Sequence, residues 1–296
     1  MSGEYIIDLP GEKREREAIR KLLQVPCLPD RVFVPLGLVS CFSWYLLNIK
    51  MERLTSTMHG DVDILTGRLD WSDPKDFELL TLEEAKNNPE FPPSSHRESA
   101  ALKLAESGGI KWPPSTDYLV GIEAKCAFFD KKTGVVKSQK SSFRKIHIQI
   151  EKLLKLGFNK VALLDIIANP PQYSEISGQA WLLSLNQSLM SIEKMEALKG
   201  RIPESSPAGH WVWSAGSVEG GDETKRGAGA PIKLRGAEQN TFLQTDPETQ
   251  SRRREMEQEL SKICSKFTSP CSFPVILIDC ENCGKIHEIK KTCDNH

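Results

Sequence analysis

Two short stretches of this sequence combine acidic side chains with residues that favour β-strands. Asp61 and Asp63 alternate with valine and isoleucine in the first stretch, and Glu123 and Lys125 alternate with apolar residues in the second. Side chains two positions apart on a strand face the same side, so each charged pair shares one face of its strand. Because burying charges is costly without a partner, the pattern predicts a metal ion, a substrate phosphate or a tight ion pair.

These residue types suit a divalent cation and chemistry at phosphorus. Mg²⁺ and Mn²⁺ prefer oxygen ligands and retain exchangeable water molecules, as hydrolysis of a phosphate ester requires. We therefore expect Asp61, Asp63 and Glu123 to be metal ligands, with Lys125 supplying a positive charge to a phosphate or a water molecule. The alternative is an ordinary set of charges at the rim of a sheet, with Lys125 paired to Glu123.

The order of these residues resembles the active-site signature of the PD-(D/E)xK, or restriction-endonuclease-like, nuclease superfamily. Gly60-Asp61-Val62-Asp63 is followed by Ile122-Glu123-Ala124-Lys125, then by a basic helix expected at about 140–156 and an apolar strand at 160–166. The resemblance implies an α/β fold with the family's αβββαβ core, in which helices flank a mixed central sheet.

The resemblance also implies a metal-dependent nuclease that hydrolyses phosphodiester bonds of DNA, with RNA not excluded. Asp63 and Glu123 would bind Mg²⁺ or Mn²⁺, Asp61 is an alternative ligand, and Lys125 would assist the attacking water. In some members a glutamine on the following helix lies near the metal, and Gln149 matches it, although the tyrosine usual one turn later is a leucine here. By analogy, we favour a role in antiviral defence or repair.

Two other functions stay open. An Asp-x-Asp flanked by apolar residues is also the metal motif of nucleotidyltransferases, which would use Asp61, Asp63 and Glu123. The Gly-Ser pair that those enzymes place shortly before the acids is missing from residues 50–58. The chain could instead be a non-catalytic nucleic-acid-binding or assembly module, which would hold DNA or RNA without Mg²⁺ and leave it uncut.

A local excess of basic residues follows the strand that carries Glu123. Between positions 137 and 160, seven lysines and arginines oppose one acidic residue, whereas the whole chain has a net charge of −1. Phosphate-binding surfaces have this character, and so do solvated helix faces. The candidate nucleic-acid contacts in this segment are Lys140, Arg144, Lys145 and Lys152.

The C-terminal region contains a second group of possible metal ligands. Cys280 and Cys283 form one CxxC pair, and Cys293 and His296 follow as a CxxH pair. Tetrahedral Zn²⁺ takes two ligands from each of two such turns, so we predict a structural zinc bound by these four residues. His287 or Cys271 could replace His296 as the fourth ligand, and reduced thiols packed as small apolar groups are the alternative.

Length and composition suggest one substantial domain with an appendage, or two small domains. We expect a nuclease-like domain at 1–215, with an insertion at about 71–114 because the two acidic stretches lie far apart. Residues 216–250 are rich in glycine and charge and are expected to form a flexible linker. Residues 251–296 are expected to form a polar helix and a small zinc-ribbon-like tail.

Residues 32–49 contain no charged side chain but include proline, glycine and polar residues. We therefore expect a buried strand-turn-helix segment there and no contact with a membrane. The charged N-terminus shows no signal peptide, which favours a cytoplasmic protein whose partners are nucleic acid and a protein partner or a second copy of this chain. Trp211 and Trp213 share one strand face and are expected to pack in the core rather than stack on bases.

Overall fold

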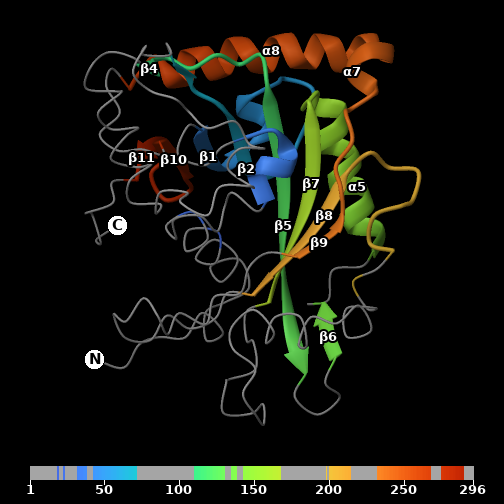
Figure 1. Cartoon of the computed structure of the whole chain (residues 1–296). Helices are drawn as coiled ribbons and strands as arrows, with labels where there is room; N and C mark the ends of the chain where they lie inside the picture. Colours follow the sequence, from blue (N-terminus) through green and yellow to red (C-terminus); the bar gives the residue numbers. More distant parts are fainter. Residues whose placement is uncertain are drawn as a thin grey trace, which may run out of the picture.

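A mixed β-sheet forms the centre of the protein (Figure 1). The computed structural model describes residues 19, 23, 32–38, 43–71, 110–130, 135–138, 143–167, 198, 200–214, 232–267 and 275–289. Within them, nine strands join in one sheet, and the expected α/β class is confirmed. The strand order is β11 (Lys285–Glu288), β10 (Val275–Cys280), β1 (Ser43–Lys50), β2 (Asp61–Arg68), β5 (Leu119–Asp130), β7 (Lys160–Ile167), β8 (Gly209–Ser214) and β9 (Ile232–Arg235), while β6 (Val135–Ser138) pairs with β5 alone.

The middle of the sheet is built from three antiparallel strands and one parallel addition. β1 pairs antiparallel with β2, and β2 pairs antiparallel with β5. Helix α5 (Phe143–Leu156) then returns the chain so that β7 pairs parallel with β5. The helix forms where Ile146, Ile150 and Leu153 repeat at helical spacing, and it ends at Gly157, whose φ of +98° favours glycine.

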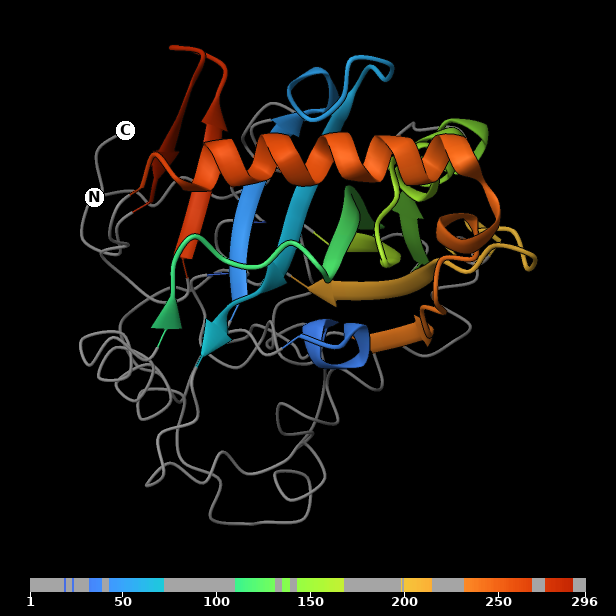
Figure 2. The ribbon, with the colours of Figure 1, turned by 90° about the horizontal axis from the view of Figure 1, so that it is seen from above.

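Two apolar cores lie on opposite faces of the sheet. On one face, α5 and α8 (Pro247–Cys264) pack residues such as Leu153 and Leu260 against the strands. On the other face, Phe33 and Leu36, the latter in the short 3₁₀ helix η2 (Val34–Leu36), cover Ile122 and its neighbours. Figures 1 and 2 show α8 lying across one end of the central strands.

The segment from residue 32 to residue 49 differs from the expected strand-turn-helix. Helical turns come first, at residues 32–36, and the strand β1 follows. Trp44 and Leu46 enter one core while Tyr45 and Leu47 enter the other, so the alternation of period two makes a strand that is buried on both faces. No helix in the described part of the chain is long and apolar enough to cross a membrane.

The sheet does not follow the expected division into a domain, a linker and a tail. Strand β9, from the expected linker, pairs with β8, and Asn240 is buried with its amide donating to the carbonyls of Leu154 and Phe158 at the end of α5. Strand β10, from the expected tail, pairs parallel with β1. The linker prediction is therefore wrong for residues 232–250, because these residues complete the main sheet and hold its helix in place.

The expected insertion at 71–114 is described only at its ends. There, β3 (Asp70–Trp71) and β4 (Ile110–Lys111) form a separate two-stranded sheet, and the residues between them lie outside the described part.

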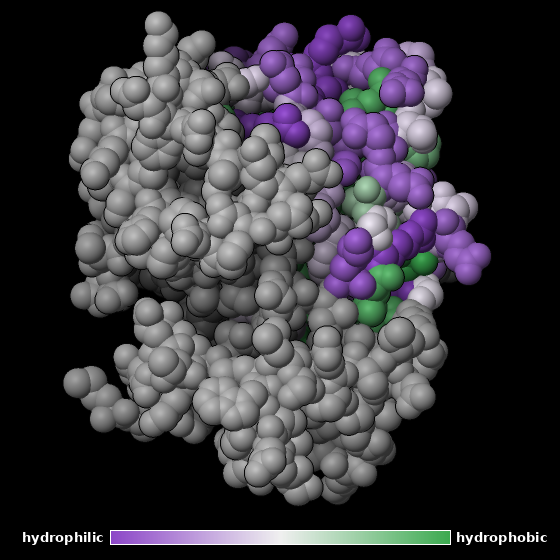
Figure 3. Space-filling view, in the orientation of Figure 1, coloured by the Kyte–Doolittle hydropathy of each residue, from purple (hydrophilic) through white to green (hydrophobic). Residues whose placement is uncertain are grey.

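Among the described residues, Ile148 is the one large hydrophobic side chain that is exposed. Figure 3 accordingly shows a mainly hydrophilic surface over the described elements on this face.

Candidate active site

Asp63, Glu123 and Lys125 lie together where the pairing of β2 and β5 stops. The last paired residues are Ile64 and Ile122, and Asp63 and Glu123 are the next residues along each strand. Both isoleucines enter the core covered by the N-terminal segment. Because side chains alternate along a strand, the three charged residues project to the opposite face, on which α5 packs.

Four groups are linked by hydrogen bonds and ion pairs at this point. The ammonium of Lys125 lies 2.5 Å from Glu123 Oε1 and 3.6 Å from Asp63 Oδ2. The same ammonium donates to the backbone carbonyl of Ala124 at 2.9 Å, and the Ala124 N–H donates to Asp63 Oδ2 at 2.7 Å. The Asp63 carboxylate thus accepts the hydrogen bond from the Ala124 N–H. A backbone carbonyl of β2 would accept it if the strand pairing continued.

The carboxylates of Asp63 and Glu123 are buried. Asp63 is 6 % exposed and Glu123 is 2 % exposed. Burial raises the pKa of the Asp63 carboxyl, and the repulsion of Asp61 adds to this effect, although Lys125 and the Ala124 N–H oppose it. The charge of Asp63 is therefore incompletely compensated, which is a condition that a bound cation would relieve.

The loop before Asp61 is fixed by contacts from two directions. Glu52 Oε1, in the 3₁₀ helix η4 (Met51–Arg53), accepts from the Gly60 N–H at 3.3 Å and lies 3.0 Å from His59 Nδ1. Lys152 of α5 donates to the His59 carbonyl at 2.9 Å. Gly60 has a φ of +128°, a conformation that glycine adopts at little cost, so the residue type fits the entry to β2.

The contacts of Lys152 orient the helix that carries Gln149. Lys145, Gln149 and Lys152 share one flank of α5, four and three residues apart. Because Lys152 reaches the loop before Asp61, this flank faces the start of β2, and Gln149 is half-buried there.

The four basic residues expected to contact nucleic acid differ in their surroundings and in how far the structure describes them. Lys145 is exposed on α5, whereas Lys152 is used in the contact to the His59 carbonyl. Lys140 lies outside the described residues, and for Arg144 only the backbone is described. Of the four basic candidates, Lys145 and Lys152 therefore lie on the flank of α5 that also carries Gln149.

A buried charged network beside this site was not foreseen from the sequence. Asp165 on β7 pairs in register with Lys125 on β5. Its carboxylate accepts from Arg201 Nη1 and lies 2.7 Å from His210 Nε2, and all three residues are at most 4 % exposed. The sequence shows Asp165 as a charged residue within the apolar run of β7. Its two partners lie 36 and 45 positions away, so no local sequence pattern identifies them.

Close packing surrounds the strands next to the site. The ring of Phe158 fills the space beside Gly121, and a Cβ on Gly121 would lie 2.4 Å from the ring. Trp211 and Trp213 are 0 % and 1 % exposed in the core, as predicted, so they are not available for stacking on bases.

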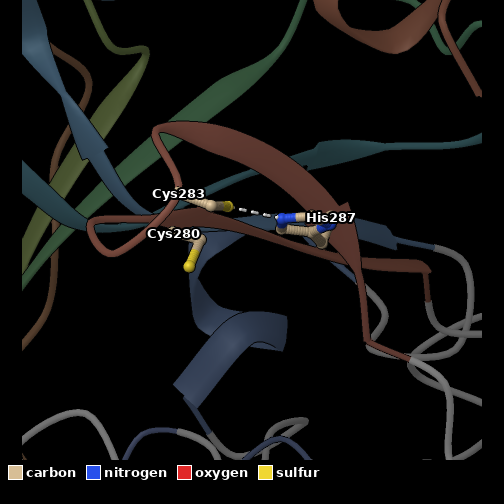
Figure 4. Close-up of side chains that lie close together, drawn as sticks. All are labelled: Cys280, Cys283 and His287. Atoms are coloured by element: carbon tan, nitrogen blue, oxygen red, sulfur yellow. Dashed lines mark hydrogen bonds between the residues drawn. The ribbon is translucent and has the colours of Figure 1, made fainter.

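A second group of possible ligands lies on the β10–β11 hairpin. The ligand atoms of Cys280, Cys283 and His287 all lie within 4.8 Å of one another. Figure 4 shows Cys283 and His287 pointing toward each other, with Cys280 beside them. Backbone N–H groups, chiefly that of Cys283, point at the Cys280 sulfur and lower the pKa of its thiol. Of the other expected ligands, Cys271, Cys293 and His296 lie outside the described residues.

No family model matches this sequence, and no curated protein or solved structure matches it either. The geometry of the site and the sequence pattern therefore carry the functional inference.

Proposed function

We propose that this protein is a metal-dependent nuclease that hydrolyses phosphodiester bonds of DNA, with RNA as a further possible substrate. The observation that carries the proposal is the convergence of Asp63, Glu123, Lys125 and the Ala124 carbonyl where two strands stop pairing. We also propose membership of the PD-(D/E)xK superfamily. The order of β1, β2, β5, α5 and β7 supports this assignment, because it matches the βββαβ part of the αβββαβ core.

The donors fit a hard divalent cation. Asp63, Glu123 and the Ala124 carbonyl offer oxygen atoms, which Mg²⁺ and Mn²⁺ prefer, and burial raises the pKa of Asp63 although Lys125 lies nearby. These groups would hold the ion, with Asp61 as a further ligand. When bound, the ion supplies Lewis-acid activation of water and of the phosphate.

Lys125 is the group of this chain best placed to act on the substrate. Its ammonium is held by the Ala124 carbonyl and Glu123, and its side chain is 15 % exposed, so it lies at the open side of the two acids. From there it can donate a hydrogen bond to the attacking water or to a phosphate oxygen, where negative charge increases in the transition state. Gln149, on the flank of α5 that faces β2, is proposed as a positioning residue.

Substrate contacts are proposed on the same flank of α5. Lys145 is exposed there and would bind the phosphate backbone, together with Lys140 and Arg144. Lys152 would act indirectly, because its ammonium holds the His59 carbonyl ahead of Asp61. A cytoplasmic location and a role in defence or repair stay predictions from the sequence.

One observation favours a second candidate. Lys125 and Glu123 are in close contact, and such an ion pair can be purely structural. The protein would then be a nucleic-acid-binding or assembly module without catalysis.

Incubation of the whole protein with circular single-stranded DNA, plasmid duplex and RNA separates these functions. The nuclease proposal expects cleavage of at least one substrate with Mg²⁺ or Mn²⁺ and none with EDTA. Retarded migration on a native gel without cleavage under every metal condition would support the binding module instead. Absence of both cleavage and retardation would contradict both candidates.

A further inference from the structure

We propose that Cys280, Cys283 and His287 bind a zinc ion that closes the β10–β11 hairpin and supports the turn leading to Asp61. This site is separate from the proposed magnesium site in position and in chemistry. Two sulfur atoms and an imidazole nitrogen favour Zn²⁺, whereas oxygen donors favour Mg²⁺. The proposal does not depend on the nuclease function.

The hairpin brings the three ligands together through its turn. Cys280 ends β10, and Gly284, with a φ of +66°, donates its N–H to the Cys280 carbonyl at 2.8 Å and so reverses the chain. Cys283 lies within this turn, and its backbone N–H points at the Cys280 sulfur. His287 lies on β11 opposite Ile278 of β10, which returns its imidazole toward the turn.

The distances require little movement for metal binding. Cys283 Sγ and His287 Nε2 are 2.9 Å apart. Two such atoms on a tetrahedral zinc ion are about 3.6 Å apart, given the usual Zn–S and Zn–N bond lengths, so the two side chains need to separate by less than about 1 Å. The three side chains leave the fourth position of the tetrahedron to a further donor.

Burial does not explain these residue types. Cys283 and His287 are exposed and Cys280 is half-buried, so none of them serves as a small apolar group in the core. A free cysteine is ordinarily among the most buried residue types, as Cys126 and Cys264 are here. The exposed pair of thiols beside an imidazole therefore points to a ligand set.

The β10–β11 hairpin contacts the segment that leads into β2. Arg53 donates to the Gly284 carbonyl at 2.6 Å and forms an ion pair of 3.0 Å with Asp279, which is buried at the end of β10. The neighbouring Glu52 holds Gly60, directly before Asp61. A metal ion that closes the hairpin would therefore hold the groups that Arg53 contacts. Arg53 lies near the start of the segment between β1 and β2, and the end of this segment, at Gly60, leads into Asp61.

Metal content and Co²⁺ spectra of the full-length protein test this site. The experiment compares the wild type with Cys283→Ser, with His287→Ala, and with His287→Cys, which keeps a ligand at that position. Asn282→Ala serves as the matched control, because Asn282 is an exposed residue of the same turn and not a ligand. Circular dichroism verifies that each variant is folded.

We expect one zinc ion per chain in the wild type and in Asn282→Ala, and thiolate-to-cobalt charge-transfer absorption when Co²⁺ replaces it. Cys283→Ser and His287→Ala should bind zinc at least about 10-fold more weakly, and His287→Cys should retain it. Zinc affinity in Cys283→Ser equal to that of the wild type would overturn the proposal. So would a wild-type protein that binds neither Zn²⁺ nor Co²⁺, and neither result would bear on nucleic-acid cleavage.

Discussion

The two strands on either side of β5 carry buried acids whose charges are compensated to different degrees. On β7, the Asp165 carboxylate contacts both Arg201 and His210. On β2, burial raises the pKa of Asp63 although Lys125 lies 3.6 Å away. The Asp165 carboxylate thus has a cation of the chain in direct contact, whereas Asp63 would gain from a bound cation, and this contrast separates a structural network from a candidate site.

Removal of Arg201 tests the structural role of the Asp165 network. Arg201→Met should lower the free energy of unfolding by about 3–5 kcal/mol, because it leaves the Asp165 carboxylate buried without its cation. The double variant with Asp165→Asn should recover part of that loss. Urea unfolding measures both, with Arg254→Met, an exposed arginine of α8, as the control. Equal stability of Arg201→Met and the wild type would show that the network does not hold the sheet.

At the scale of elements, local sequence periodicity located most of the central segments. The helix expected at 140–156 is α5, and the strand expected at 160–166 is β7, each within three residues at its ends. Helix α8 begins at Pro247, earlier than the segment expected from residue 251, because Asp246 caps it by accepting from the N–H groups of Glu248 and Thr249. That signal was readable in the sequence and was missed.

Long-range pairing could not be predicted in the same way. Strand β10 completes the sheet by pairing with β1, more than 200 positions earlier, and nothing in either segment specifies the other. The same reason explains why Asp63, Glu123 and Lys125 could be proposed from a pattern of strand positions, whereas the partners of Asp165 could not. His287 was only an alternative ligand, since the spacing alone did not show which residue the hairpin returns to the cysteines.

The contact between α8 and the turn before β2 depends on pH. Glu255 accepts from Thr55 Oγ1 at 2.7 Å and from the Ser56 N–H at 2.8 Å, and these bonds, the first above all, lower the pKa of its carboxyl. A carboxyl whose pKa is lower in the folded state than its ordinary value of 4.5 stabilises the protein at a pH above 4.5. This contribution is lost as the pH falls through the folded-state pKa.

Glu255→Gln should therefore unfold at lower urea concentration than the wild type at pH 7, and the difference should shrink toward acidic pH. Urea unfolding across this range measures the effect. Glu238→Gln, at an exposed position, should match the wild type throughout. If the difference in unfolding urea concentration between Glu255→Gln and the wild type stays constant with pH, the charge of Glu255 does not stabilise this contact.

At the scale of the whole molecule, the beginning and the end of the chain share one sheet. Leu277 of β10 is fully buried in the same core as Trp44 of β1 and Leu260 of α8. Leu277→Ala should therefore destabilise the main cooperative unfolding transition by about 2–5 kcal/mol. Lys285→Ala, at an exposed position of β11, is the control. A main transition that is unchanged in Leu277→Ala would mean that the C-terminal hairpin folds as a separate unit.

The central claim is that Asp63, Glu123 and Lys125 form a metal-dependent site for phosphodiester hydrolysis. The most direct test measures the single-turnover rate of cleavage with Mg²⁺ for the wild type, Glu123→Gln and Lys125→Ala. Lys155→Ala is the matched control, because Lys155 is a surface lysine of α5 that pairs with Glu151.

We predict that Glu123→Gln and Lys125→Ala cut at least about 100-fold more slowly than the wild type, while Lys155→Ala keeps the wild-type rate. Chelated wild type should regain activity when Mg²⁺ is restored, since the oxygen donors of this site favour that ion. Cleavage by Glu123→Gln and Lys125→Ala at the wild-type rate would contradict the assignment of the site.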